Sequence, residues 1–146
     1  MKKIPLAVLV VACMSFVNWH TNMEEVKQLA KKEHKHILLN FSGSDWCGPC
    51  IKLHEELFAS LPFQHFAESN LVLINADFPR MKKNQLSKVQ QNINDALADK
   101  YNSKGSFPLT VLLNENGKVI KAWEGTPKGN PEEFVEELQF VIAQDK

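Results

Sequence analysis

Two cysteines stand three positions apart in the segment Trp46-Cys47-Gly48-Pro49-Cys50. Upstream, His36–Ser42 is typical of a short buried strand, and Gly43-Ser44-Asp45 would end it. Downstream, Ile51–Ser60 has neither glycine nor proline and carries apolar residues at roughly helical spacing. The cysteine pair is therefore expected where a strand ends and a helix begins.

This position favours thiol chemistry at Cys47. The unpaired N–H groups and aligned dipoles of a helix N-terminus stabilise an anion, so Cys47 should ionise more easily than a free thiol and act as the nucleophile. Cys50 lies about one helical turn further on, close enough to form a disulfide with Cys47, and suits the role of resolving thiol. Pro49 has no N–H to lose at a helix start, and it stiffens the loop.

Other uses of this cysteine pair have less support. A structural zinc site needs four ligands, and although His54 lies one turn beyond Cys50, the sequence offers no second Cys pair or paired His. Covalent haem needs His directly after the second cysteine, where this chain has Ile51. A purely structural disulfide stays open, although a loop closed over so few residues would stabilise the folded state little.

The segment Phe41–Cys50 resembles the active-site segment of thioredoxin-like proteins, and its last five residues match thioredoxin itself. Gly43–Cys47, followed later by Asp77-Phe78-Pro79, is similar to a secreted bacterial branch of that family, which includes a disulfide-isomerase-like group. The resemblance covers about residues 22–145. It implies an α/β thioredoxin fold, with a central mixed β-sheet flanked by helices, and redox chemistry without a metal or an organic cofactor.

The composition fits one globular domain. The chain has 146 residues, of which 44% are hydrophobic and 23% charged, enough to bury an ordinary core. Its 17 basic and 17 acidic side chains cancel, so the charge balance indicates no surface for nucleic acid.

The beginning of the chain is typical of export. Lys2-Lys3 followed by the apolar Ile4–Val11 resembles a secretory signal, and the apolar run is shorter than the roughly 20 residues of a transmembrane helix. We expect residues 1–18 to form a leader and residues 19–146 to form the thioredoxin-like domain. The protein would then act in the periplasm or otherwise outside the cytoplasm.

The same segment can also be interpreted as the leader of a lipid-anchored protein. Val10-Val11-Ala12-Cys13 resembles a bacterial lipobox, in which Cys13 would be lipidated and hold the protein on a membrane. Conventional cleavage near Ser15 is the alternative. On either reading, Cys47 and Cys50 remain as the pair for dithiol chemistry.

Periodicity and turn residues predict the remaining elements. In chain order, they are a helix over 22–33 with a capping box at Thr21, a short helix over 63–68, a strand over 71–76, a helix from Asn84 to Tyr101 whose apolar residues pack, strands over 109–113 and 118–123, and a helix from Asn130-Pro131 to Ile142. Compared with thioredoxin, the first strand is missing or reduced to a stub around residues 16–19. The strand–helix–strand order implies a parallel pair, whereas Asn116-Gly117 between two apolar runs indicates an antiparallel hairpin.

The segment Asp77-Phe78-Pro79-Arg80 follows the second long strand and should border the same cleft as the cysteines. Arg80-Met81-Lys82-Lys83 reads as a solvated basic loop. A substrate-facing role for Phe78 and Arg80 is the alternative.

Phe107-Pro108 precedes the first strand of the hairpin. The resemblance implies a cis proline here, beside the nucleophilic cysteine, and implies that the backbone N–H and C=O of Phe107 pair with an extended substrate segment. Phe107 occupies a position that tunes substrate choice in the family, and it is bulkier than the residues common there. The expected substrate-binding residues are Trp46, Gly48, Pro49, Phe107 and Pro108.

Two further positions depart from thioredoxin. Thioredoxin buries an acid near the end of the strand before the motif, where it serves proton transfer with the resolving cysteine, and this chain has Asn40 there. A Lys of the next strand corresponds to Leu73. A neutral amide cannot take a proton, so water, Asp45 or another group would perform the step, or the transfer would be slower.

The resemblance predicts a thiol–disulfide oxidoreductase. Gly48-Pro49 is the pair found between the cysteines of reducing thioredoxins, and it favours the reducing direction. A disulfide isomerase of the same fold and a non-catalytic thioredoxin-fold binding module are the alternatives. The expected partners are disulfide-containing proteins and a membrane or soluble electron donor, and the protein is expected to be a monomer.

Overall fold

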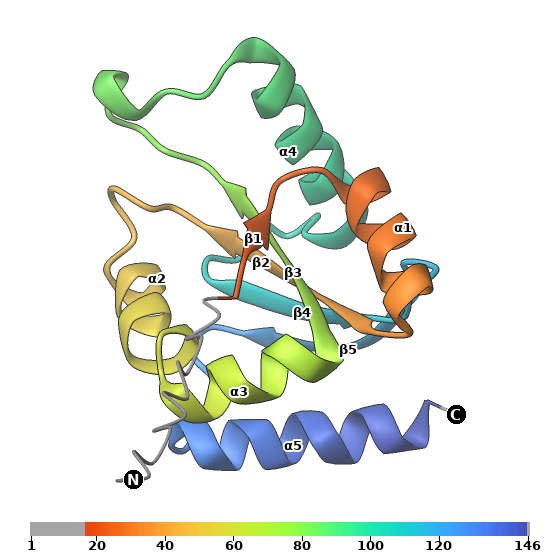
Figure 1. Cartoon of the computed structure of the whole chain (residues 1–146). Helices are drawn as coiled ribbons and strands as arrows, with labels where there is room; N and C mark the ends of the chain where they lie inside the picture. The colour runs from red at the N-terminus through yellow and green to blue at the C-terminus, as the bar shows by residue number, and fades with distance from the viewer. Residues whose placement is uncertain (1–16, 146) are drawn as a thin grey trace, which may run out of the picture.

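The computed structural model describes residues 17–145, and these form a mixed β-sheet between two layers of helices (Figure 1). Within this part of the chain the sheet has five strands in the order β1-β3-β2-β4-β5. Their bounds are β1 Trp19–His20, β2 His36–Ser42, β3 Leu71–Asp77, β4 Leu109–Leu113 and β5 Val119–Glu124. Strands β1, β3 and β2 are parallel, and β4 and β5 are antiparallel to their neighbours. The mixed sheet, the hairpin and the short first strand confirm the prediction.

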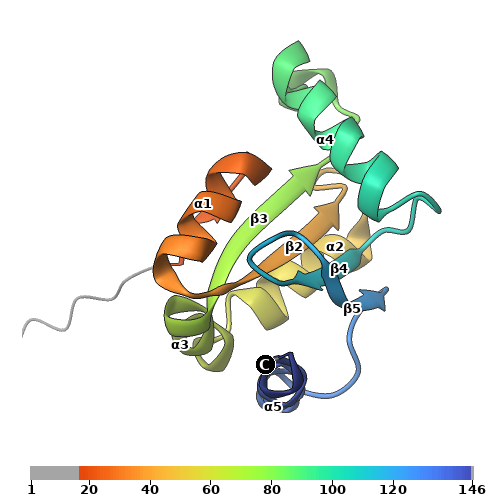
Figure 2. The same ribbon diagram turned by 90° about the vertical axis from the view of Figure 1, so that its right-hand side faces the viewer.

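Helices cover both faces of the sheet. They are α1 Met23–Glu33, α2 Gly48–Leu53 with the π-helical turn η1 His54–Phe58, α3 Leu61–Asn70, the 3-10 turn η2 Lys82–Asn84, α4 Lys88–Tyr101 and α5 Pro131–Gln144. Helices α1 and α4 lie on one face, and α2, α3 and α5 lie on the other (Figure 2). Over residues 17–145, every helix is too short or too polar to cross a membrane.

Residues 1–16 lie outside the described part of the chain. They hold most of the expected leader, including Cys13 and its lipobox.

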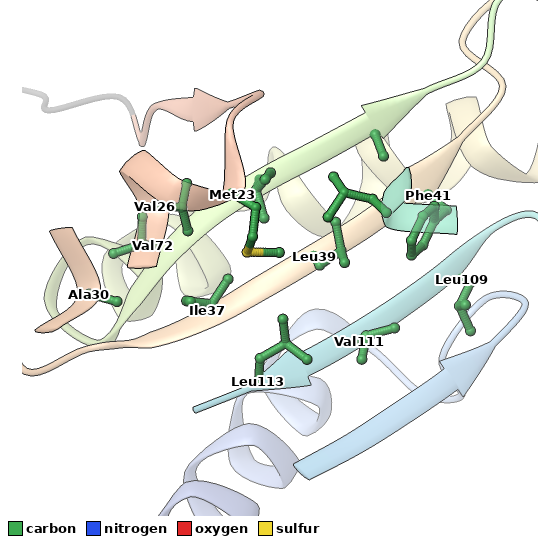
Figure 3. Packing of buried hydrophobic residues seen from close by; sticks show 13 residues of the cluster. Met23, Val26, Ala30, Ile37, Leu39, Phe41, Val72, Leu109, Val111 and Leu113 are labelled. Carbon is green, nitrogen blue, oxygen red and sulfur yellow. The ribbon is translucent and has the colours of Figure 1, made fainter. Parts of the chain in front are cut away.

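The two faces of β2 build two separate cores, because successive side chains of a strand point to opposite sides. Ile37, Leu39 and Phe41 pack with α1 and with β3 and β4 in a first cluster, which Figure 3 shows from close by. Leu38 belongs to a second cluster that α2, η1, α3 and α5 complete. Leu73, which stands where thioredoxin has a Lys, is buried in this second cluster.

The second face turns polar near the carboxyl ends of the parallel strands. Asn40 lies beside Asn75 of β3 and Thr110 of β4, and Ser42 lies beside Asp77. By the same alternation, these side chains share the face of Leu38, on which α2 packs. The sheet therefore changes from an apolar to a polar floor beneath the start of α2.

Two predicted helix starts were wrong. Helix α1 is capped by Asn22, whose Oδ1 accepts hydrogen bonds from two backbone N–H groups of the first turn, and the predicted capping box at Thr21 is not formed. Helix α4 begins at Lys88 with Ser87 as its cap, because the side chain of Asn84 is already bound to Asp45. Val89, which was expected to pack, is 71% exposed.

The other boundaries shift by smaller amounts. Helix α2 begins at Gly48, with Pro49 in its first turn as predicted, and α3 extends over Leu61–Asn70 with Ser60 as its cap. Helix α5 begins at Pro131 as predicted, with a full capping box between Asn130 and Glu133.

Candidate functional site

Cys47 and Cys50 are joined by a disulfide at the start of α2, with their Cα atoms 5.2 Å apart. Cys47 is the N-cap residue of α2, and its Sγ accepts a hydrogen bond from the backbone N–H of Cys50 at 3.3 Å. In this oxidised state the two side chains are 5% and 3% exposed. The helix start thus directs an N–H group at the sulfur of Cys47, where an anion would be stabilised. Gly48 and Pro49 are exposed in the first turn.

An aromatic rim stands beside the cysteines, formed by Trp46, Phe78 and Phe107 with the guanidinium of Arg80. The indole Nε1 of Trp46 donates to the backbone O of Phe78 at 2.7 Å. The ring of Phe107 lies 5.5 Å, centroid to centroid, from the rings of both Trp46 and Phe78. The Cζ of Arg80 lies 3.6 Å from the centroid of the indole, an arrangement that favours cation–π attraction.

The loop after β3 therefore borders the cysteine motif, as the sequence predicted. Phe78 and Arg80 lie against Trp46, while Lys82 and Lys83 are exposed in the way expected of a solvated basic loop.

Asp45 ties this loop to the motif. Its carboxylate accepts hydrogen bonds from the backbone N–H groups of Arg80 at 2.9 Å and Met81 at 3.0 Å, and from the side-chain amide of Asn84 at 3.0 Å. The bond from the Arg80 backbone is the main cause that lowers the pKa of Asp45. A carboxylate held in this way is a poor proton acceptor, which argues against Asp45 as a substitute for the missing acid.

A polar ladder crosses the sheet behind the cysteines and consists of Thr110, Asn40, Asn75, Ser42 and Asp77. The Thr110 hydroxyl donates to Asn40 Oδ1 at 3.3 Å, and Asn40 Nδ2 donates to Asn75 Oδ1 at 3.0 Å. Asn75 Nδ2 donates to the hydroxyl of Ser42, which in turn donates to Asp77, each at 3.3 Å. Asn40 is 4% exposed, so a buried amide fills the place of the acid in thioredoxin.

Between this ladder and α2 lies a cavity of about 230 Å³. Its lining residues are Asn40, Ser42, Ser44, Cys50, Ile51, His54, Glu55 and Asn75. The cavity was not expected from the sequence, because its walls combine the end of β2 and the start of α2 with Asn75 of β3, which lies far from both in the chain.

The peptide bond between Phe107 and Pro108 is cis, as the resemblance implied. Asn102 holds Ser106 through both the N–H and the C=O of Ser106, at 2.8 and 2.9 Å, and the O of Pro108 accepts from Gly125 N–H at 2.8 Å. Between these anchors, the N–H and C=O of Phe107 have no hydrogen-bond partner among residues 17–145. The backbone of Phe107 is thus available to another chain.

Within the same range of residues, no group of three or more His, Cys, Asp and Glu side chains is placed to hold a metal ion. The two sulfurs of the cysteine motif are bonded to each other.

Sequence comparison relates the chain to bacterial redox proteins. A family described as a thioredoxin-like domain matches residues 23–142. Disulfide bond reductase DsbH of Chlamydia pneumoniae is 34% identical over 113 residues, which are 77% of this chain and 66% of DsbH. Thioredoxin-related protein DsbJ of the same organism is 29% identical over 102 residues, which are 70% of this chain and 28% of DsbJ. The match covers less than two thirds of either relative's own length.

Solved structures agree with this relation. A structure described as DsbH oxidoreductase has a TM-score of 0.80 and 28% identity, and the match covers 98% of this chain and 94% of that one. A thioredoxin from Thermus thermophilus has a TM-score of 0.65 and 16% identity, covering 89% and 90% of the two chains, and it shows the shared fold alone. The chain belongs to the thioredoxin-like family, and its fold is the thioredoxin fold.

Proposed function

We propose that this chain is a thiol–disulfide oxidoreductase that reduces disulfide-containing proteins through Cys47 and Cys50. The placement of Cys47 carries the proposal: its Sγ caps α2, accepts the N–H of Cys50 and is bonded to the Cys50 sulfur one turn further on. The match to a protein named disulfide bond reductase supports the reducing direction, as does Gly48-Pro49 between the cysteines.

The reaction starts from the reduced pair. The thiolate of Cys47 attacks a substrate disulfide, forms a mixed disulfide and expels one substrate sulfur as a thiolate, which then takes up a proton. The thiolate of Cys50 next attacks the Cys47 sulfur, the second substrate sulfur leaves, and the bridge between Cys47 and Cys50 forms. Two electrons pass to the substrate in each cycle, so a membrane or soluble electron donor has to reduce the bridge again.

The substrate would bind along the edge formed by Trp46, Gly48, Pro49, Phe107 and Pro108. An extended segment can pair with the free N–H and C=O of Phe107 as a short added strand. The rim contributes apolar area through Trp46 and Phe78, and Arg80 adds a positive charge.

We further infer that the protein works as a monomer outside the cytoplasm, with residues 1–18 as its leader. The basic start and apolar run of that segment support export. Lipidation at Cys13 and cleavage near Ser15 are distinguished by the intact mass of the protein recovered from the envelope.

The first test is the reduction potential of the Cys47–Cys50 pair, measured by equilibrating the protein with glutathione buffers. We expect a value of about −270 mV, which is typical of thioredoxin, rather than the roughly −120 mV of a strong oxidant of this fold. A value in the oxidising range would overturn the reducing direction.

Kinetic variants test the chemistry itself. Cys47→Ser should abolish reduction of a protein disulfide, and Cys50→Ser should trap the mixed disulfide. A protein whose Cys47 shows no reaction with disulfides would be a binding module. A protein that reshuffles scrambled disulfides at full rate after Cys50→Ser would be an isomerase.

A further inference from the structure

Cys50 has to lose a proton before it can resolve the mixed disulfide, because the thiolate is the nucleophile. Its side chain is 3% exposed, and burial disfavours the charged form of a thiol. A nearby group that accepts the proton would therefore speed the second step of the proposed reaction.

The cavity behind Cys50 is the route that the structure offers for this proton. Its volume of about 230 Å³ has room for several water molecules, each of which occupies about 30 Å³ in the liquid. Buried Cys50 and Asn40 line it together with His54 and Glu55, which are exposed. The cavity thus connects a buried thiol with two titratable side chains that reach solvent.

The polar ladder cannot accept the proton. Asn40 and Asn75 are neutral amides that donate and accept hydrogen bonds without taking up a proton. The carboxylate of Asp77 accepts from the hydroxyls of Ser42 and Ser44 and from the N–H of Ser44 and Phe78, and Asp77 is not among the residues that line the cavity. The ladder fixes the floor of the cavity, and His54 and Glu55 are left as candidates.

His54 suits the task better than Glu55 does. It lies four residues after Cys50, and its backbone N–H donates to the backbone O of Cys50, which places it one turn further along the same side of the helix. Its ring lies beside the rings of Trp19 and Phe58, at centroid distances of 6.0 and 6.3 Å. An imidazole is also the side chain whose charge changes nearest neutral pH, so it exchanges protons with a thiol more readily than a carboxylate does.

We propose that His54 accepts the proton of Cys50 through water in this cavity. The proposal rests on the oxidoreductase function above. The S–H bond of Cys50 breaks as its proton passes to the imidazole, and the thiolate then attacks the Cys47 sulfur. The bond from Cys47 to the substrate breaks, the bond from Cys47 to Cys50 forms, and the substrate thiolate and the imidazolium exchange protons with solvent.

The two chemical steps can be followed separately with an aromatic disulfide that yields a coloured thiol. The attack of Cys47 in the reduced protein releases one aromatic thiol from this disulfide. The second aromatic thiol leaves when Cys50 resolves the mixed disulfide. We expect His54→Gln to slow the second release at neutral pH by at least about tenfold and to leave the first within about twofold. The matched control is His65→Gln, because His65 is an exposed histidine of α3, and it should change neither release.

Two further measurements separate chemistry from folding. Added imidazole should restore the second release in His54→Ala, because a small base can enter the space that the side chain vacates. Asn40→Asp places a carboxyl in the cavity wall, so His54→Gln should lose most of its effect in that background.

The outcomes are distinct. An unchanged second release in His54→Gln, a slowed release that imidazole does not restore, or a larger effect of Glu55→Gln than of His54→Gln would each overturn the role of His54. Absence of the first release in the unmodified protein would instead overturn the oxidoreductase function.

Discussion

At position 43, the absence of a side chain makes room for Trp46. A Cβ built on Gly43 would overlap the indole of Trp46, whereas one built on Gly48 would have no atom within 4 Å. The position of the indole matters because its Nε1 donates to the backbone O of Phe78, and the guanidinium of Arg80 lies over its face. The whole aromatic rim therefore depends on one glycine.

We expect Gly43→Ala to lower the free energy of unfolding by about 1–3 kcal/mol, because the added methyl group has to push the indole aside. It should also slow the attack of Cys47 on a protein disulfide, since the rim moves with the indole. Urea unfolding of the oxidised protein and the rate of substrate reduction check the two effects. Gly48→Ala is the matched control and should stay within about 1 kcal/mol of the unmodified protein. Equal losses in the two variants would contradict this account.

Single residues also show what the sequence can and cannot reveal. The places of Cys47 and Cys50 and the cis bond before Pro108 were predicted, because they belong to a contiguous motif or to a family position. The role of Asp45 was missed, because its partners Arg80 and Asn84 lie 35 and 39 residues away in the chain. Contacts between residues so far apart in the chain produce no local periodicity or spacing in the sequence from which they could be predicted.

At the scale of elements, the segment from Phe78 to η2 is held to the motif by the carboxylate of Asp45. This explains why α4 starts later than its apolar pattern suggested. The pattern holds from Ile93 to Tyr101, which pack in the first cluster, but Val89 is exposed. Asn84 is bound elsewhere, and Ser87 caps the helix instead. The existence and order of the elements could be predicted, whereas a cap that is drawn into a tertiary contact could not.

Acid should loosen this attachment. The backbone N–H of Arg80, followed by the amide of Asn84, lowers the pKa of Asp45. A carboxyl with a lowered pKa in the folded state contributes stability that is complete above its unfolded pKa of about 3.9 and is lost as the pH falls through the folded value. We expect Asp45→Asn to lower the melting temperature at neutral pH, and the difference from the unmodified protein to shrink below about pH 4. A difference that stays constant down to about pH 2 would argue against the role of the carboxylate.

Helix α5 depends on its cap at the N-terminus. Asn130 Oδ1 accepts from Glu133 N–H at 2.9 Å, and Glu133 Oε2 accepts from Asn130 N–H at 3.0 Å. We expect Asn130→Ala to lower the free energy of unfolding by about 1 kcal/mol, measured by urea unfolding, because the N–H of Glu133 loses its partner. Asn92→Ala, in the exposed middle of α4, is the control and should be neutral or slightly stabilising. Equal destabilisation by the two changes would show that the cap is not the cause.

In the molecule as a whole, the apolar core and the proposed redox site occupy different parts of the sheet. The two apolar clusters fill the space under the helices, and the polar ladder and cavity lie at the carboxyl ends of β2 and β3. The order of strands and helices indicated that edge as the site, because loops after parallel strands gather there. The cavity could not be foreseen, since it depends on the seating of α2 above Asn40 and Asn75.

The second cluster can be tested with two phenylalanines of α5. Phe134 is 1% exposed and lies 6.4 Å from Phe63 and 5.2 Å from Trp123 between ring centroids, whereas Phe140 is 65% exposed. We expect Phe134→Ala to lower the free energy of unfolding by about 3–5 kcal/mol, because it leaves a cavity in the core. Phe140→Ala should change it by no more than about 0.5 kcal/mol. Urea unfolding of the two variants gives the comparison, and similar values would contradict the packing of α5.

The guanidinium above Trp46 also determines how the site responds to dissolved salt. Arginine keeps its charge at any pH at which proteins fold, so a change of acidity does not remove it. Dissolved ions do screen it, over a Debye length of about 10 Å at 0.1 M. Added salt should therefore slow the association of anionic substrates and speed that of cationic ones. Of two substrates with opposite charge, the one that is reduced faster in dilute buffer can therefore be reduced more slowly in concentrated buffer, with no change in the chemistry of the cysteines.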